Sequence, residues 1–104
     1  MASPDYLQVG QHVGGTAVVV RAVGEVDMSS AQVLSRQLSQ ATATSTPTNP
    51  VVLDLRQAEL FGSSGLAVLV TAHTQCQQRG TPLRVVAGPS VTRRLQRAGL
   101  LDLL

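Results

Sequence analysis

The sequence predicts one α/β domain, in which helices pack as a sandwich on a mixed β-sheet. Segments with strand and helix patterns follow one another along the 104 residues in the order strand, strand, helix, strand, helix, strand, helix. The first two strands are close enough in sequence to form an antiparallel hairpin, whereas each later strand follows a helix-length connection and must pair in parallel. A chain of this length fits a single domain, residues 1–104, with one hydrophobic core.

The amino-terminal residues predict the hairpin. A short first strand is expected from Tyr6 to the Gly14-Gly15 turn. Residues 16–23 hold four valines, and this density of β-branched side chains favours a second strand. A Gly-Gly pair between two such runs is typical of a tight hairpin turn. The second strand closes with Gly-Glu-Val-Asp at residues 24–27.

A first helix is expected next. Ser29 and Gln32 have the spacing of a capping box, which predicts the start of a helix. Apolar residues then recur at helical intervals and predict one buried stripe: Ala31, Leu34, Leu38 and Ala41. The threonine-rich residues 42–50 include two prolines, so this stretch is expected to be a loop.

The apolar residues 51–55 predict a strand that is covered on both faces, and residues 58–61 are expected to connect it to a second helix. The helical pattern begins at Leu66, with one face predicted to hold Leu66, Leu69, Val70 and His73. Helix-stop signals follow: Arg79, Gly80 and Pro82.

The remaining residues predict a fourth strand over 83–87 and a third helix that opens at Pro89-Ser90 and ends at Gly99. Val91, Leu95 and Ala98 are expected to face inward, and Arg93, Arg94 and Arg97 outward. The outward arginines form either a solvated face or a contact for an acidic partner. Leucines from Leu100 onward begin a further element that this sequence does not complete.

Composition excludes several classes of function. All eight basic residues are arginine, so chemistry that needs a lysine on this chain is excluded, including P-loop and Schiff-base chemistry. A net charge of +2 and only two aromatic residues argue against a nucleic-acid groove. Cys76 is the single cysteine and has no partner for an internal disulfide. With no signal-peptide pattern and only short apolar runs, we expect a cytoplasmic protein without membrane insertion.

Weaker patterns suggest other sites. Gly-Ser-Ser-Gly at residues 62–65 is one residue short of a hydrolase nucleophile elbow, so we do not expect an enzyme. His73 and Cys76 are three residues apart, but no second pair completes a metal site, and neither metal nor cofactor is expected. Asp54, inside an apolar strand, is either a functional acid or a carboxylate that reaches loop amides.

Ser63 and Ser64 lie between two glycines, where a strand-exit loop meets the start of the second helix. Free amide groups and the helix dipole make such a position favourable for a negative group. One of these serines either caps the helix or serves as a site of modification. Local pattern alone leaves both interpretations open.

The ordered set of motifs resembles the STAS domain family, and more closely its bacterial anti-sigma factor antagonists. It comprises residues 24–27, 51–55 and the Phe-Gly-Ser-Ser-Gly-Leu of 61–66, and it continues to Ala98-Gly99-Leu100. The resemblance implies a STAS-like sandwich that binds an anti-sigma factor, usually a serine kinase, and so frees a sigma factor. It further implies phosphorylation of Ser63, reversed by a serine phosphatase, and a partner interface of these residues: Asp27, Ser29, Gly62, Ser63, Ser64, Gly65 and Leu66.

This sequence departs from the family at two places. Gly62 stands where the family commonly has an aspartate, which removes a carboxylate beside the expected phosphorylation site. The last strand and helix are expected to be short or missing after Leu104. The first departure keeps open an alternative: a STAS module that acts as a scaffold in a signalling complex or a transport machine, without phosphorylation.

Overall fold

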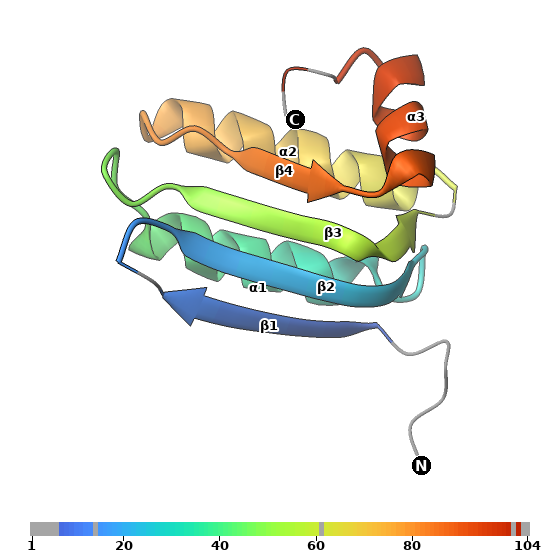
Figure 1. The fold of residues 1–104 in the computed structure, drawn as a ribbon, viewed down its shortest axis with the longest axis horizontal. Coiled ribbons are helices and arrows are strands. Elements are labelled where there is room, and N and C mark those ends of the chain that lie inside the picture. Colours follow the sequence, from blue (N-terminus) through green and yellow to red (C-terminus); the bar gives the residue numbers. More distant parts are fainter. Residues whose placement is uncertain (1–6, 14, 61, 101, 103–104) are drawn as a thin grey trace.

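A computed structural model describes residues 7–13, 15–60, 62–100 and 102, and it has the predicted order of elements. The elements are β1 (Gln8–Val13), β2 (Val18–Val26), α1 (Ala31–Thr44), β3 (Val51–Leu60), α2 (Ser64–Gln78), β4 (Arg84–Ala87) and α3 (Pro89–Arg97). The strands form one sheet in the order β1-β2-β3-β4. Helices α1 and α2 lie side by side on one face of the sheet, and α3 packs at the end where β3 and β4 finish (Figure 1).

The predicted mixed topology is confirmed. β1 and β2 are antiparallel, with Gln8 opposite Val23, and β3 is parallel to both of its neighbours. Because β2 and β3 run in the same direction, their carboxyl ends meet at one edge of the sheet. Val26 lies opposite Leu60 at this edge, and the loops that lead to α1 and α2 both start from it.

The core lies between the sheet and the layer formed by α1 and α2. β2 contributes Val18, Val20, Ala22 and Val26, all fully buried. The predicted apolar stripe of α1 is confirmed, since each of its members is buried: Ala31, Leu34, Leu38 and Ala41. α1 is longer than expected, because it continues to Thr44 and takes in the first three residues of the predicted loop.

One strand prediction and one capping prediction are wrong. β3 does not end at residue 55 but continues to Leu60, because Ala58 and Leu60 alternate with polar residues and are buried. The capping box of Ser29 and Gln32 does not form: Ser30 is the residue before α1, and no side chain caps the helix.

The predicted inner face of α2 needs correction. The buried residues of this helix are Gly65, Leu69, Ala72 and Cys76, whereas Val70 is 45% exposed. Leu66 and His73 are only partly buried. In α3, Val91 and Leu95 face inward as predicted, but Ala98 is exposed at the end of the helix. The predicted last element from Leu100 lies mostly outside the described residues, as do Tyr6 and Gly14 of the predicted hairpin.

Candidate functional site

Ser63 lies at the start of α2 with its side chain exposed. Its backbone carbonyl accepts a hydrogen bond from the N–H of Ala67 at 3.0 Å, which closes the first helical turn. Its hydroxyl makes no cap hydrogen bond, so the capping interpretation of Ser63 is wrong. A hydroxyl that is exposed and uncommitted to the helix is accessible to another protein.

Gly62 shapes the approach to Ser63. Its φ of +66° is left-handed, a conformation that side chains with a Cβ rarely adopt. A Cβ placed on Gly62 meets no atom within 4 Å, so the requirement for glycine comes from the backbone and not from crowding. Aspartate tolerates this conformation better than most residues. Glycine at this position leaves no carboxylate directly before Ser63.

Gly65 brings α2 against the carboxyl ends of β2 and β3. A Cβ on Gly65 would lie 2.9 Å from Leu60 Cδ2 and 3.4 Å from Val26 Cγ1, which is closer than side chains normally pack. The residue is buried, so it acts beneath the surface and not on it. This close contact places the start of α2 beside the loop that follows β2.

Asp27 organises that loop. Its Oδ1 accepts hydrogen bonds from the backbone N–H of Ser29 at 2.9 Å and of Ser30 at 3.1 Å, and from the Ser29 hydroxyl at 2.7 Å. The hydrogen bond from the Ser29 hydroxyl is the main reason why the pKa of Asp27 lies below its usual value. The Ser30 hydroxyl donates to the carbonyl of Glu25 at 2.8 Å and ties the loop back to β2. The loop therefore has a defined shape.

Met28 lies at the tip of the same loop and is 87% exposed. Sequence reasoning missed this residue, although an apolar side chain among Asp27, Ser29 and Ser30 was a visible signal. Exposed methionines are common on binding surfaces because the side chain is flexible and polarisable. We call Asp27, Met28, Ser29, Gly62, Ser63, Ser64 and Leu66 together the switch surface.

Arg94 of α3 reaches the same region. Its Nη2 donates a hydrogen bond to the backbone carbonyl of Gly62, and the side chain is half-buried. The prediction that Arg94 faces outward with Arg93 and Arg97 is therefore wrong for this arginine. Ser90, at the start of α3, donates to the carboxylate of Glu59 near the end of β3. Together these bonds hold α3 next to the switch surface.

Comparison with known proteins gives the family. A family model described as the STAS domain matches residues 8–104. The chain belongs to the STAS family.

Two curated relatives and one solved structure illustrate the similarity of this STAS domain to known proteins. Anti-sigma-F factor antagonist RsfA of Mycobacterium tuberculosis is 29% identical over 90 residues, which cover 86% of this chain and 70% of RsfA. Osmosensory protein A of M. tuberculosis is 30% identical over 96 residues, which cover 90% of this chain but only 59% of that protein. An anti-sigma factor antagonist of Mycobacterium paratuberculosis has a crystal structure that superposes with a TM-score of 0.83 at 30% identity, covering 98% of this chain and 86% of the other.

Asp54, the candidate acid inside the third strand of the STAS domain, has structural partners. Asp54 is buried and pairs with Arg56, whose Nη2 lies 2.8 Å from Oδ2. This bond is the main cause of the lowered pKa of Asp54, and the same carboxylate accepts the backbone N–H of Arg56 at 3.0 Å. The carboxylate therefore satisfies an amide and a guanidinium of its own strand.

Metal binding gains no support from the described part of the chain, which contains no group of three potential ligands among its His, Cys, Asp and Glu residues. The two residues with suggestive spacing differ in burial: Cys76 is fully buried and His73 only partly. The Cys76 sulfur lies 3.6 Å from the Thr42 hydroxyl of α1. Cys76 thus belongs to the packing between the two helices.

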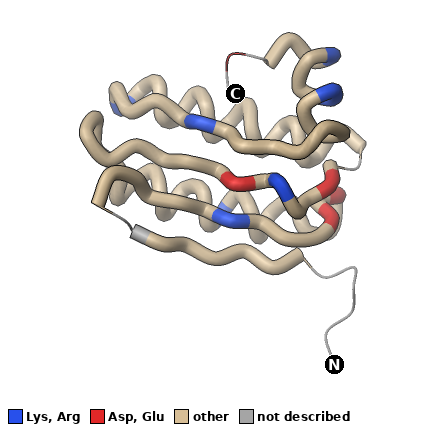
Figure 2. The backbone as a smooth tube through the Cα atoms, viewed as in Figure 1, with Lys and Arg blue, Asp and Glu red and all other residues tan. Residues whose placement is uncertain are grey.

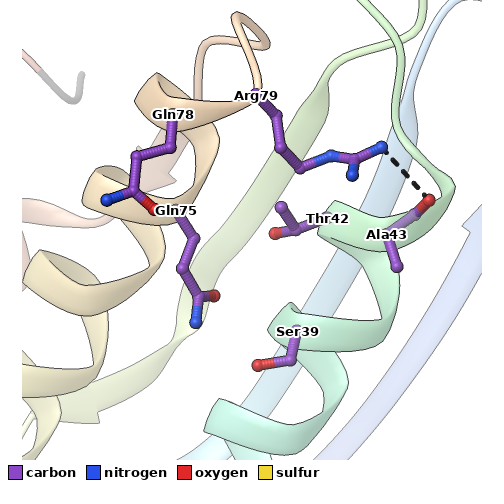
Figure 3. Close-up of a pocket in the computed structure, with 6 residues that line it drawn as sticks. All are labelled: Ser39, Thr42, Ala43, Gln75, Gln78 and Arg79. Atoms are coloured by element: carbon purple, nitrogen blue, oxygen red, sulfur yellow. Dashed lines mark hydrogen bonds between the residues drawn. The ribbon is translucent and has the colours of Figure 1, made fainter.

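A shallow hollow of about 250 Å³ lies between the carboxyl-terminal ends of α1 and α2. Figure 3 shows Arg79 extending from the end of α2 towards the carbonyl of Ala43, to which it donates a hydrogen bond. The lining holds amide and hydroxyl groups but no acid or histidine. Because this hollow is at the opposite end of α2 from Ser63, it is separate from the switch surface. Within the described residues, no helix combines the length and the apolar character that crossing a bilayer requires.

Proposed function

We propose that this STAS domain is an anti-sigma factor antagonist, which binds an anti-sigma factor through the switch surface and thereby releases a sigma factor. The names of RsfA and of the M. paratuberculosis structure support the choice of partner. The proposed role is binding, without a catalytic step on this chain. Because a sigma factor acts where transcription takes place, the proposal also assigns the chain to the cytoplasm.

The observation that supports this most directly is the exposed hydroxyl of Ser63, which is free of cap bonds and lies beside the ordered loop of Asp27 and the exposed Met28. A neutral hydroxyl at this position allows an apolar and hydrogen-bonding partner to approach. The same position controls binding if its charge is changed.

Phosphorylation of Ser63 by a serine kinase is the proposed control. The γ-phosphoryl group of ATP passes to the Ser63 oxygen, the hydroxyl proton leaves to solvent, and ADP departs. The modification adds about −1.5 to −2 charges. Burying such a group in an interface without a partner charge costs several kcal/mol, and each 1.4 kcal/mol weakens binding about tenfold. A serine phosphatase would restore binding by removing the phosphate.

Partner capture with three variants tests the proposal. Ser63→Ala is expected to retain the anti-sigma factor, and Ser63→Glu is expected to lose at least about tenfold in affinity. Ser39→Glu is the matched control, because Ser39 is exposed on α1 beside the distant hollow and receives the same change in charge. Incubation with the kinase and ATP, followed by mass spectrometry, locates the phosphate. Phosphate found only on other residues would exclude Ser63.

A scaffold function is the second candidate. Gly62 favours it, because this chain offers a kinase no carboxylate directly before Ser63. Equal capture of the partner by wild type, Ser63→Ala and Ser63→Glu would support the scaffold.

A further inference from the structure

The guanidinium of Arg94 is one peptide unit away from Ser63. Its Nη2 donates to the carbonyl of Gly62, and the next backbone atom along the chain is the nitrogen of Ser63. Its Nε–H is buried and has no acceptor. An arginine presents five N–H donors in a planar fork, so most of the donor capacity of Arg94 is unused in the unmodified protein.

Arg97 lies one helical turn further along α3. With Leu66 and Ala98, the two arginines line an open hollow of about 360 Å³ next to the first turn of α2. Among the described residues, neither Arg94 nor Arg97 forms an ion pair with a carboxylate. Figure 2 shows basic residues on α3 beside the sheet end where acidic residues gather.

We propose that Arg94 and Arg97 form an intramolecular receptor for the phosphate of phosphorylated Ser63. The inference rests on the phosphorylation in the proposed function and adds what happens to the phosphate afterwards. Arginine is suited to this role, because its fork matches two phosphate oxygens at once. In the unmodified protein Arg94 donates to the Gly62 carbonyl. After phosphorylation of Ser63, the phosphate is a stronger acceptor for the Arg94 guanidinium than this carbonyl.

The receptor supplies a partner charge for the phosphate, so the cost of burying an unpaired phosphate no longer acts alone, and the space that the held phosphate occupies also keeps the partner away. A phosphate held by α3 spans from Ser63 to Arg94 and Arg97, and it therefore covers part of the switch surface around Leu66. The arginines also offset the acidic residues at the same end of the sheet, Glu25, Asp27 and Glu59, which disfavour a dianion there. The phosphorylated state is thus held in one arrangement that excludes the partner.

The test uses phosphoserine introduced at position 63 during translation, with the ³¹P NMR signal followed against pH. The second pKa of a phosphoserine is about 6. Arg94→Gln and Arg97→Gln are each expected to raise this pKa by about one pH unit relative to the unsubstituted phosphoprotein, because a cation within hydrogen-bond reach favours the dianion. Arg93→Gln is the matched control: it removes the same charge from the same helix, but its exposed side chain does not line the hollow. This control is expected to change the phosphate pKa far less.

Equal pKa values in the unsubstituted protein and both variants would overturn the receptor, as would an effect of Arg93→Gln as large as theirs. Urea unfolding of each unmodified variant identifies any general loss of structure, and Arg94→Lys, which keeps the charge but not the fork, is expected to give an intermediate pKa. Because the phosphoserine is installed without a kinase, the titration tests the arginines independently of the proposed function. Failure of that function appears instead as unchanged partner capture by Ser63→Glu.

Discussion

At the scale of single residues, the switch surface depends on a few atoms with specific bonds. The Asp27 carboxylate fixes one loop through two backbone amides and a hydroxyl. The left-handed backbone of Gly62 and the close contact of Gly65 with Leu60 fix the other side. Sequence reasoning found these positions, because glycines and an acid before a helix are visible signals. It placed Arg94 on an outward face with Arg93 and Arg97, since three arginines on one short helix look alike until packing places one of them against a carbonyl.

The loop of Asp27 gives the protein a stability that depends on pH. Its pKa is lowered below the usual 3.8 by hydrogen bonds that exist only in the folded chain. The unfolded state therefore binds the proton more readily, so this contribution is present above the unfolded pKa of about 4 and is lost as the pH falls through the folded value. Asp27→Asn is expected to flatten the decrease in melting temperature below pH 4, measured by circular dichroism. Parallel curves for wild type and Asp27→Asn would contradict the role of Asp27.

At the scale of elements, the sequence predicted the type and order of every strand and helix but not all of their faces and ends. The predicted end of β3 is too early because Gln57 and Glu59 interrupt the apolar run, although Ala58 and Leu60 keep the alternation of a half-buried strand. The predicted inner face of α2 is wrong because small residues make many of the helix's contacts: Gly65, Ala72 and Cys76. A hydrophobic pattern gives most weight to large side chains and therefore favoured Val70.

The corrected face of α2 predicts different costs for two neighbouring residues. Leu69 is fully buried, so Leu69→Ala is expected to reduce the free energy of unfolding by about 2–5 kcal/mol. Val70→Ala, on the exposed side, is expected to change it by only about 0.5 kcal/mol. Urea denaturation of both variants measures the difference. Similar losses in the free energy of unfolding at the two positions would contradict the observed face and support the face predicted from the sequence.

At the scale of the whole molecule, the parallel pairing of β2 with β3 brings two distant segments to one end. The loop after β2 and the start of α2 are more than 30 residues apart in sequence, yet both leave the sheet at the edge where Val26 lies opposite Leu60. This juxtaposition was predictable, because the carboxyl ends of parallel strands coincide. The exposure of Met28 and the hydrogen bond of Arg94 were not predictable from the sequence, since both depend on how the loops and α3 pack at that edge.

This assembled end predicts a residue important for binding. Met28→Ala is expected to weaken capture of the anti-sigma factor by about fivefold or more, which corresponds to about 1 kcal/mol, the cost found at the minority of interface residues that anchor a contact. Val33→Ala is the control, since Val33 is also an exposed apolar residue but lies on α1 outside the switch surface. Neither change is expected to alter the urea midpoint. Equal affinity of the two variants for the anti-sigma factor would show that Met28 is not part of the interface.

The burial of Cys76 between α1 and α2 has a practical consequence. This is the one thiol of the chain and it is fully buried, so a maleimide or disulfide reagent can reach it only when the helical layer separates from the sheet or the two helices part. The rate of thiol labelling therefore measures opening of the domain at a single, naturally placed probe. No cysteine has to be removed or introduced before opening is compared between the unmodified and the phosphorylated protein.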